Sequence, residues 1–533
     1  MAGTGRGTIC KMCFLPAIAI LGMLVRTAIA ADYHVDSHSG ADGNDGLSPQ
    51  RAWKSLERVN RETFRPGDRI LFRAGSRYTG QLRPTGSGAL VDGKPMPITI
   101  DSYGKGKRPR IDGKGVAPAT FLLRNVEYWE VRNLEITNKG KDPEPTRTGV
   151  SVHIEDFGTA HHIILNGLYI HDINGSHRKK DGGGAGINWH NGGSRIKSRF
   201  DGLTIENCHI QRCVRNGITN GGYWQRDVWH PNLNVVIRGN LIEEVPGDGI
   251  VPVACDGALV ERNVMRDSPR LPDDGGGAAG IWPWSSDNTV IQFNEVSGHK
   301  APWDGQGFDS DWNCRNSVIQ YNYSHDNEGG FVLICNPGDT VMPMNIGNIG
   351  TVVRYNISVN DGLRATGKHA GFSPAFHVSG PVQKTRIYNN LICAPRKRSP
   401  KIERTLLRMD NWGSVRWPED TLFANNIFLS ADGFKLVFGS DQGTIFTHNC
   451  YAGVRENAPP DPQAVLKDPA FFGWKAPLRA PADPARVFRL SADSPCRRAG
   501  TRITDDGGRD FAGTVLPADG PVSIGPLEFT AKE

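Results

Sequence analysis

Residues 299–336 concentrate carboxylate and aromatic side chains in one short stretch of the chain. Asp304, Asp309 and Asp311 lie close together within it, and further ionisable side chains follow them. Hydrolysis of a glycosidic bond needs two carboxyl groups that flank the bond, one to protonate the leaving oxygen and one to activate water or attack the sugar. The stretch therefore predicts chemistry on a carbohydrate.

The spacing of Asp309 and Asp311 favours a shared role. Residues i and i+2 of a strand point to the same face, ~6.5–7 Å apart along the backbone. Neighbouring carboxylates push each other's pKa values apart, which suits an acid and a base. The candidate catalytic residues are Asp248, Asp304, Asp309, Asp311, His325 and Glu328. The alternative is that Asp304, Asp309 and Asp311 form turns or bind calcium.

A glycine followed by an apolar residue recurs around this stretch and sets the direction of the neighbouring side chains. If the apolar residue points inward, the residues two and four positions after the glycine point outward. This register places two exposed tryptophans, Trp282 and Trp284, on the coil before the carboxylates, where they would stack on sugars. The alternative is that they pack under a loop. The candidate substrate-binding residues are Asn188, His190, Trp224, Trp282, Trp284 and Trp303.

The elements that carry these residues are short Val- and Ile-rich runs that end in asparagine. Their asparagines are 23 to 41 residues apart, at Asn166, Asn207, Asn240, Asn263, Asn294, Asn322, Asn356, Asn390, Asn426 and Asn449. Repeats at this spacing with strand character predict a solenoid of β-strands. We expect an all-β right-handed parallel β-helix, with the asparagines forming a ladder at equivalent bends and with capping segments at both ends.

Composition agrees with a turn-rich β-architecture. The 533 residues include 64 glycines, apolar residues make up 38%, and the formal net charge is only +6 without a concentrated basic patch. Nucleic acid is therefore not an expected partner. Eight cysteines follow residue 31, and none forms a Cys/His cluster with zinc spacing. We expect them to be free and buried, and we assign no metal ligands.

Four segments are expected along the chain. Residues 1–31 have the basic, apolar and small-residue regions of a secretory signal peptide, which predicts a secreted or periplasmic protein with no membrane association after cleavage. Residues 32–120 would form an N-terminal cap and first coils, 121–455 the parallel β-helix, and 456–533 a C-terminal cap over the open end.

Several short motifs resemble those of secreted right-handed parallel β-helix (pectin-lyase-like) proteins that act on carbohydrates. They include Tyr33-His-Val-Asp36, Pro66-Gly67-Asp68 and Ile524-Gly525-Pro526. This superfamily contains glycoside hydrolases, polysaccharide lyases and epimerases, so the fold alone does not decide the reaction. The chain departs from the pectinase pattern because Ser310 separates Asp309 from Asp311, and the Gly-His-Gly motif is absent.

These observations together predict a secreted glycoside hydrolase that degrades a polysaccharide or oligosaccharide with paired aspartates. One alternative is a calcium-dependent polysaccharide lyase of the same fold, with Lys300 or an arginine as the base and calcium at the aspartates. A second alternative is a non-catalytic carbohydrate-binding surface protein, which needs the tryptophans but not the carboxylates. No cofactor is expected other than calcium in the lyase alternative, and a monomer is expected.

Overall fold

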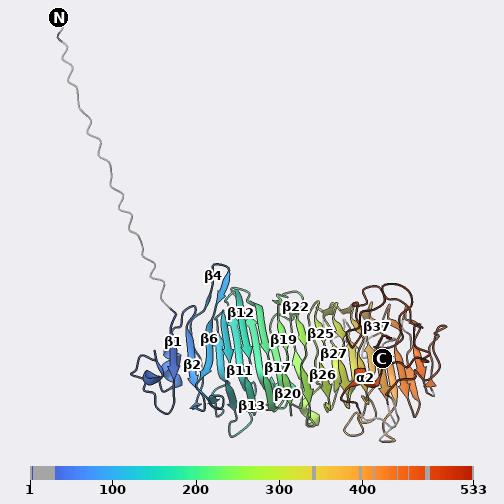
Figure 1. Cartoon of the computed structure of the whole chain (residues 1–533), viewed down its shortest axis with the longest axis horizontal. Helices are drawn as coiled ribbons and strands as arrows, with labels where there is room; N and C mark the ends of the chain where they lie inside the picture. Colours follow the sequence, from blue (N-terminus) through green and yellow to red (C-terminus); the bar gives the residue numbers. More distant parts are fainter. Residues whose placement is uncertain are drawn as a thin grey trace.

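The chain folds into an elongated right-handed parallel β-helix, whose coils follow one another from the N-terminal to the C-terminal end (Figure 1). The computed structural model describes residues 3, 30–338, 344–394, 399–411, 415–440, 442–453, 455–473 and 480–530. The segment expected to be a signal peptide lies outside the described residues, apart from Gly3, Ala30 and Ala31. No helix in the described part of the chain is long and apolar enough to cross a lipid bilayer.

Three faces of parallel strands make up the described solenoid. The first is β1 (Asp32–Val35), β2 (Arg69–Arg73), β6 (Ile98–Tyr103), β9 (Trp129–Arg132), β12 (Thr159–Asn166), β15 (Arg199–Glu206), β19 (Val236–Arg238), β23 (Leu259–Glu261), β25 (Val290–Gln292), β29 (Val318–Gln320), β33 (Val352–Arg354), β37 (Arg386–Tyr388), β40 (Leu422–Ala424) and β43 (Ile445–Thr447), with β18 (Asn232–Leu233) and β22 (Cys255–Asp256) beside it. The second is β3 (Arg77–Thr79), β7 (Arg110–Asp112), β10 (Glu135–Asn138), β13 (Tyr169–Ile173), β16 (His209–Cys213), β20 (Leu241–Glu243), β24 (Val264–Arg266), β26 (Glu295–Ser297), β30 (Tyr323–His325), β34 (Ile357–Val359), β38 (Leu391–Ala394), β41 (Ile427–Ser430) and β44 (Cys450–Ala452).

The third face has two parts. One part is β8 (Ala119–Arg124), β11 (Thr148–Glu155), β14 (Ala185–Gly192), β17 (Asn216–Gly221) and β21 (Ile250–Val251); the other is β27 (Gln306–Ser310), β31 (Gly330–Cys335), β35 (Phe376–Ser379), β39 (Thr405–Asp410), β42 (Phe434–Val437) and β45 (Arg455–Glu456). The remaining elements are β4 (Ala89–Val91), β5 (Lys94–Met96), β28 (Cys314–Arg315), β32 (Asn348–Ile349), β36 (Val382–Gln383), α1 (Leu56–Arg61), α2 (Pro484–Val487), η1 (Pro49–Arg51), η2 (Lys179–Asp181) and η3 (Asp273–Gly275).

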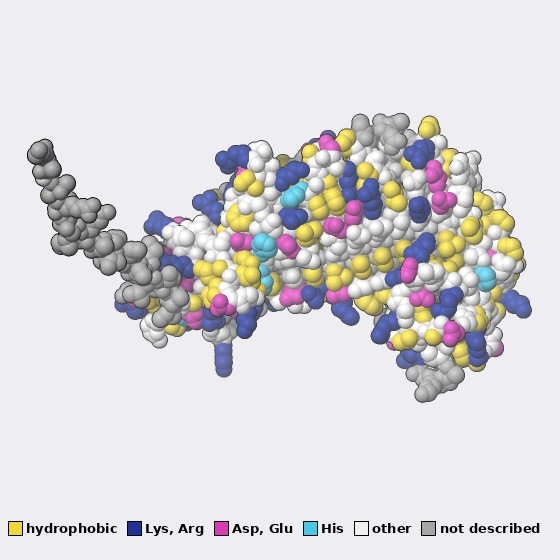
Figure 2. Space-filling model, turned by 90° about the horizontal axis from the view of Figure 1, so that it is seen from above, with side chains coloured by type: hydrophobic (Ala, Val, Ile, Leu, Met, Phe, Trp, Pro, Cys, Tyr) yellow, Lys and Arg dark blue, Asp and Glu magenta, His cyan; other side chains and the backbone are white. Residues whose placement is uncertain are grey.

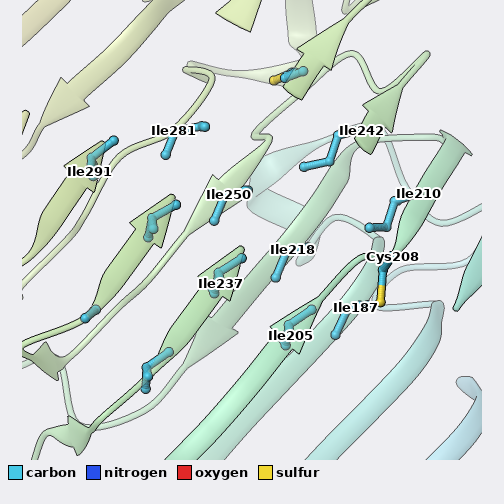
Figure 3. Close-up of a cluster of buried hydrophobic side chains, with 14 of the residues drawn as sticks. Ile187, Ile205, Cys208, Ile210, Ile218, Ile237, Ile242, Ile250, Ile281 and Ile291 are labelled. Carbon is cyan, nitrogen blue, oxygen red and sulfur yellow. The ribbon is translucent and has the colours of Figure 1, made fainter. Parts of the chain in front are cut away.

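Apolar side chains stack in columns inside the solenoid. Ile187, Ile218, Ile250 and Ile281 form one such column on the third face, in register from coil to coil (Figure 3). All four are fully buried. Because each coil buries its apolar face against the next, the core is continuous along the axis. The eight cysteines after the expected signal segment are free and buried, as predicted.

A ladder of buried asparagines runs along the bend between the first and second faces. Each side-chain amide from Asn240 to Asn426 donates to the side-chain oxygen of the next asparagine at 2.9–3.0 Å. The last one, Asn449, donates to Asp461, which ends the ladder. The prediction of an asparagine ladder is therefore confirmed for the eight positions from Asn240 to Asn449.

The prediction is wrong for Asn166 and Asn207. Their side chains lie outside the ladder, and that of Asn166 donates to Glu206. The equivalent bend is occupied by Leu168 and Cys208, whose carbonyls accept the backbone bonds that Asn240 accepts one coil later. The first coils therefore fill this bend with apolar side chains, and the amide ladder begins only where asparagine replaces them.

The third face is interrupted at the tryptophan coil. The tryptophan coil is the one that carries Trp282 and Trp284; it contains Pro283, and the coil before it contains Pro252. Proline has no N–H to donate to the next strand. Trp282 and Trp284 still donate their backbone N–H groups to Ile250 and Pro252, at 3.0 and 3.1 Å. The coil is thus aligned with its neighbours without forming a regular strand.

The glycine register is wrong at two places. Gly330 pairs with Gln306, so Phe331 and not Gly330 stands opposite Gly307; the amides of Phe331 and Val332 both donate to the carbonyl of Ala375. As a result Val332 pairs with Phe308 and points inward, while Leu333 and Cys335 point outward. Gly371 precedes a loop, and the next strand of this face begins later, at Phe376.

The C-terminal segment covers the side of the solenoid as well as its end. Phe488, Leu490 and Ile524 pack on the outward side chains of the second face, such as Ile357 and Leu391. Val465 pairs with Cys450 of the last coil. Seen from above, the surface mixes basic and acidic side chains without a field of one sign (Figure 2).

We predict that Asn322→Ala lowers the free energy of unfolding by about 2–4 kcal/mol. The change removes the acceptor of the Asn294 amide and strands the carbonyl of Ile291, both buried. Asn166→Ala, outside the ladder, is the matched control and should change it by less than about 1 kcal/mol. Chemical denaturation measures both, and equal effects would contradict the structural role of the ladder.

Candidate active site

Two of the predicted carboxylates lie on the outward side of β27. Ser310 between them points inward, where its hydroxyl contacts that of Thr351 at 3.0 Å. Asp309 and Asp311 therefore share the opposite, outward face, as the alternation predicts. Asp309 is only 5% exposed, and its Oδ1 atom has no hydrogen-bond partner. Asp311 is partly exposed and accepts hydrogen bonds from the thiol of Cys335 at 3.1 Å and from the backbone of Trp312 at 2.8 Å.

Asp304 joins this pair from the loop that precedes β27. Its backbone pairs with Ala278 of the coil before. Its carboxylate lies against Gly277, where a Cβ atom would overlap Oδ2, so the approach depends on glycine at that position. Like Asp311, Asp304 keeps part of its surface exposed.

The three carboxylates share one electrostatic environment. Burial raises the pKa of Asp309 well above its ordinary value, and Asp311 and Asp304 add to the rise. Burial also raises the pKa of Asp304, and that of Asp311 to about 6, although the hydrogen bonds from Cys335 and Trp312 oppose the rise. Such mutual effects operate only between close groups. The structure thus brings the three together.

Trp282 and Trp284 point outward as predicted, but they are less exposed than the prediction required. Trp282 is only 6% exposed, and its indole N–H donates to Asp248 at 3.1 Å. Trp284 stacks on Trp224 with ring centroids 4.9 Å apart and meets Trp312 edge-on at 5.1 Å. The loop that carries Trp224 folds over the face, so these rings form a small apolar cluster of their own.

Asp248 lies in the coil before the tryptophan coil, next to Trp282, and forms a buried ion pair. Its Oδ2 atom lies 2.6 Å from the guanidinium of Arg215, which is fully buried. Although burial works against ionisation, the charges of Lys179 and Arg215 hold the pKa of Asp248 below its ordinary value. The group is thus kept ionised and holds the indole of Trp282.

Two cavities lie on either side of the carboxylates along the solenoid. The first, of about 200 Å³, is bordered by Lys179, Asn188, Arg215, Asp248 and Trp282 among others. The second, of about 320 Å³, is bordered by Trp303, Asp304, Gln306, Arg364, Phe372, His377, Arg408 and Asp410 among others. Asp304 lies on the wall of the second. A chain of sugars running parallel to the axis would pass the carboxylates between the two cavities.

Asp410 organises the far side of the second cavity. It accepts hydrogen bonds from Arg408 at 2.7 Å and from Ser379, and it lies 3.2 Å from His377. Although burial opposes it, these groups hold the pKa of Asp410 below its ordinary value. His377 and Arg408 continue the outward column of Asp309 and Leu333, two and three coils further on.

The remaining predicted residues lie apart from the carboxylates. His325 belongs to the second face, where Asp326 and Glu295 raise its pKa to about 9 despite its burial. Glu328 binds Arg270 with both carboxylate oxygens, at 2.6 and 2.7 Å. Asn188 borders the first cavity, and His190 packs against His153 with ring centroids 5.0 Å apart.

Sequence reasoning did not find Lys179, Arg215, Cys335, Arg364 or the His377–Asp410 group. Lys179 comes from the short η2 and Arg364 from a loop, neither of which has a periodicity to read. Cys335 and His377 would have been found if Phe331 had been recognised as the equivalent of Gly307. Among the described residues, no group of three or more His, Cys, Asp and Glu side chains has the arrangement of a metal site.

Comparison with known proteins supports the fold. Residues 186–348, which contain the three carboxylates, match the model of the right-handed β-helix region. The solved structure of a GH136 lacto-N-biosidase from Eubacterium ramulus superposes with a TM-score of 0.54 and 29% identity, covering 67% of this chain and 64% of that one. The structure of XylC with xylose has a TM-score of 0.52 at 12% identity, which shows the fold alone, over 94% of this chain and 98% of that one.

One curated relative aligns with most of the chain. A lacto-N-biosidase of Bifidobacterium longum subsp. longum is 27% identical over 589 aligned positions, covering 92% of this chain. An α-1,3-galactosidase A of Akkermansia muciniphila is 26% identical over 185 positions, 29% of this chain and 30% of that protein. The chain spans about a third of the length of the B. longum protein, 34%.

We predict that Asp248→Asn lowers the free energy of unfolding by about 3–5 kcal/mol, because it leaves the buried guanidinium of Arg215 without its counter-charge. Asp256→Asn is the matched control, since Asp256 accepts a hydrogen bond from the exposed Asn288 at 2.7 Å, and its loss should cost little. Denaturation curves measure both. Unchanged stability of the Asp248 variant would contradict an anchoring role.

Proposed function

We propose that the protein is a glycoside hydrolase that cleaves an oligosaccharide or polysaccharide at the carboxylates of β27. The observation that carries the proposal is the group of Asp304, Asp309 and Asp311, whose pKa values are all raised on one partly enclosed outward face. The likeness to lacto-N-biosidases over most of the chain supports the same reaction class. Export through the segment 1–31 is part of the proposal.

The environments of the three carboxylates indicate different roles. Asp311 has a pKa of about 6 and two hydrogen-bond donors, so it is largely ionised at neutral pH. Asp304 borders the second cavity, and burial raises its pKa, which favours the protonated form. Both retain exposed surface, whereas Asp309 is buried and its pKa is raised well above the ordinary value. We therefore assign Asp304 and Asp311 as the pair that meets the substrate.

The reaction then balances with water alone. Asp304 gives its proton to the glycosidic oxygen as the bond to the anomeric carbon breaks. Asp311, as a carboxylate, either takes a proton from the attacking water or attacks the anomeric carbon and is later displaced by water. Asp309 stays neutral beside them, which spares the site a third negative charge.

Hydrolysis is favoured over elimination by this arrangement. A lyase needs a base for the proton next to a uronic-acid carboxylate and a cation to neutralise that carboxylate, whereas three carboxyl groups converge here. Lys300 does not border either cavity, and two of the arginines that do, Arg215 and Arg408, are ion-paired with aspartates. Calcium dependence remains a prediction that belongs to that alternative.

We expect Asp304→Asn and Asp311→Asn each to lower kcat by about 10²-fold or more, because each removes an ionisable group that takes part in the reaction. Asp309→Asn keeps a neutral group where the raised pKa favours the neutral acid, and it should change kcat by less than about tenfold. Reducing-end release from a panel of oligosaccharides, including ones that end in lacto-N-biose, measures all three with the unmodified protein.

A large loss of kcat in Asp309→Asn with little loss in Asp304→Asn would instead assign the reaction to the Asp309–Asp311 pair that the sequence alone suggests. Products that absorb in the ultraviolet and that disappear with a chelator would support the calcium-dependent lyase. Binding without turnover on every member of the panel would support the non-catalytic alternative. Melting temperatures of the variants separate loss of chemistry from loss of fold.

The thiol of Cys335 should set the acidic limb of the pH profile. Burial raises the pKa of Cys335 well above its ordinary value, so the thiol stays protonated and donates to ionised Asp311. Cys335→Ala removes a bond that favours the carboxylate, so the acidic limb of kcat/KM should move up from about pH 6 by roughly half a unit to one unit. Cys335→Ser keeps a donor and should leave the limb at or below its original position.

Cys213→Ala is the control, since it removes an equally buried thiol on the second face, whose Sγ lies 3.8 Å from a backbone carbonyl. The other charged groups that act on Asp311 are Asp304, Asp309 and Lys179, which these changes leave in place. Acidic limbs that coincide for the alanine and serine variants would contradict the role of the thiol.

A further inference from the structure

The second cavity contains a buried guanidinium without a counter-ion. We call this second cavity, of about 320 Å³, the arginine cavity; its borders include Trp303, Asp304, Gln306, Arg364, Phe372 and Arg408. Arg364 is only 2% exposed, and its Nε atom has no hydrogen-bond partner. One terminal nitrogen donates to the backbone carbonyl of Asp304, which is neutral. Among the described residues, no carboxylate lies within ion-pair distance of Arg364.

Each nearby carboxylate either is bound by other groups or has a raised pKa. Glu328 binds Arg270 through both oxygens, and Asp410 is bound by Arg408, Ser379 and His377. Burial raises the pKa of Asp304 and favours its uncharged form. No carboxylate therefore pairs directly with Arg364, although the charges of Asp304 and Glu328 act on it from further away, and a buried charge without a direct partner is costly.

The backbone holds Arg364 in this position from both sides. Its own N–H donates to the carbonyl of Glu328 at 3.1 Å, and its carbonyl accepts from Gly371 at 2.9 Å. A Cβ atom at Gly305 would lie 2.8 Å from its guanidinium, so the packing around the head group depends on glycine. The arginine is placed at the cavity by the fold and is not a surface side chain that has folded in.

Two further cavity residues have unused polar atoms. Gln306 is buried, and its side-chain oxygen has no partner; His369 has a ring nitrogen, Nε2, without one. Apolar surface completes the wall, since the ring of Trp303 is 46% exposed and that of Phe372 is 37% exposed. Polar atoms that await partners, beside exposed aromatic rings, are typical of a site for a sugar unit.

We propose that the arginine cavity binds a sugar unit that carries an acidic group, a carboxylate or a sulfate, which pairs with Arg364. The place of this unit beside the bond that is broken rests on the proposed function. A neutral sugar would contact Trp303 and Phe372 but would leave the guanidinium unpaired. An acidic oxygen would supply both the missing acceptor and the missing charge, and guanidinium groups pair well with carboxylates and sulfates.

The test compares binding of D-galacturonate, its methyl ester and D-galactose 6-sulfate to the full-length protein by calorimetry. We expect an acidic probe to bind about tenfold or more tightly than the neutral ester, because charge-assisted hydrogen bonds are roughly twice as strong as neutral ones. The better of the two acids identifies the group as a carboxylate or a sulfate. Equal binding of the ester and both acids by the unmodified protein would overturn the proposal without any variant.

Variants then assign the preference to Arg364. Arg364→Gln should abolish the difference between acid and ester, whereas Arg364→Lys, which keeps the charge, should retain part of it. Arg262→Gln, which removes an arginine packed on Phe293 of the first face, is the control and should change nothing. An acid preference that survives Arg364→Gln would overturn the assignment, and melting curves show whether that variant is folded.

These outcomes are separate from those of the proposed function, since no turnover is measured. Binding of an acidic probe by a protein that hydrolyses no glycan would remove the proposed function and leave the acidic site. Hydrolysis by a protein that binds the acids and the ester equally would remove the acidic site and leave the proposed function.

Discussion

The hydrogen bond from one asparagine amide to the next is the interaction on which the coils around the candidate site depend. It repeats at every coil from Asn240 to Asn449 and satisfies buried polar groups at a bend that the strands themselves leave unpaired. Because every coil takes the same bend, strands on the third face begin in register, and their outward side chains form straight columns. Asp309, Leu333, His377 and Arg408 follow one such column, so the site inherits its geometry from the ladder.

The replacement of the repeated glycine by Phe331 fixes which side chain lies next to Asp311. Gln306 pairs with Gly330 and Ser310 with Ile334, so Phe331 stands opposite Gly307 and Cys335 lies next to Asp311. A register counted from Gly330 would instead place Ile334 there, which could donate nothing to the carboxylate.

The fold was predictable from the sequence to a greater extent than the site. Spacing and alternation were sufficient for a β-helix, for eight of the asparagines, and for the shared face of Asp309 and Asp311. They failed at Asn166, where the bend is apolar, and at Gly330, where a register counted one residue early reverses every later direction. Lys179 comes from the short η2 and Arg364 from a loop, and the positions of both depend on contacts distant in sequence. His325 looked catalytic because it is near in sequence, but a bend carries it to another face.

The tryptophan coil shows why exposure is harder to predict than direction. Alternation correctly predicts that Trp282 points outward. Its side chain is nevertheless only 6% exposed, because the loop with Trp224 covers the face. Two large exposed rings would be costly in water, and covering them costs only the ordering of one loop. Trp282 therefore forms a wall with a fixed indole N–H, and Trp303 is left as the open aromatic surface.

The charges around β27 explain why one face supports both an acid and a base. Three carboxylates close together and largely buried cannot all ionise. Which of them ionises is decided by donors: Asp311 has the thiol of Cys335 and a backbone amide, whereas the Oδ1 atom of Asp309 has none. Two arginines near these carboxylates are ion-paired with other aspartates: Arg215 binds Asp248, and Arg408 binds Asp410. A guanidinium placed directly against Asp304 would ionise it and remove the proton that the reaction needs. Arg364 instead donates to the backbone carbonyl of Asp304. Its charge lowers the pKa of the acid, but burial outweighs this effect, so the acid form stays favoured and the guanidinium remains open to a ligand.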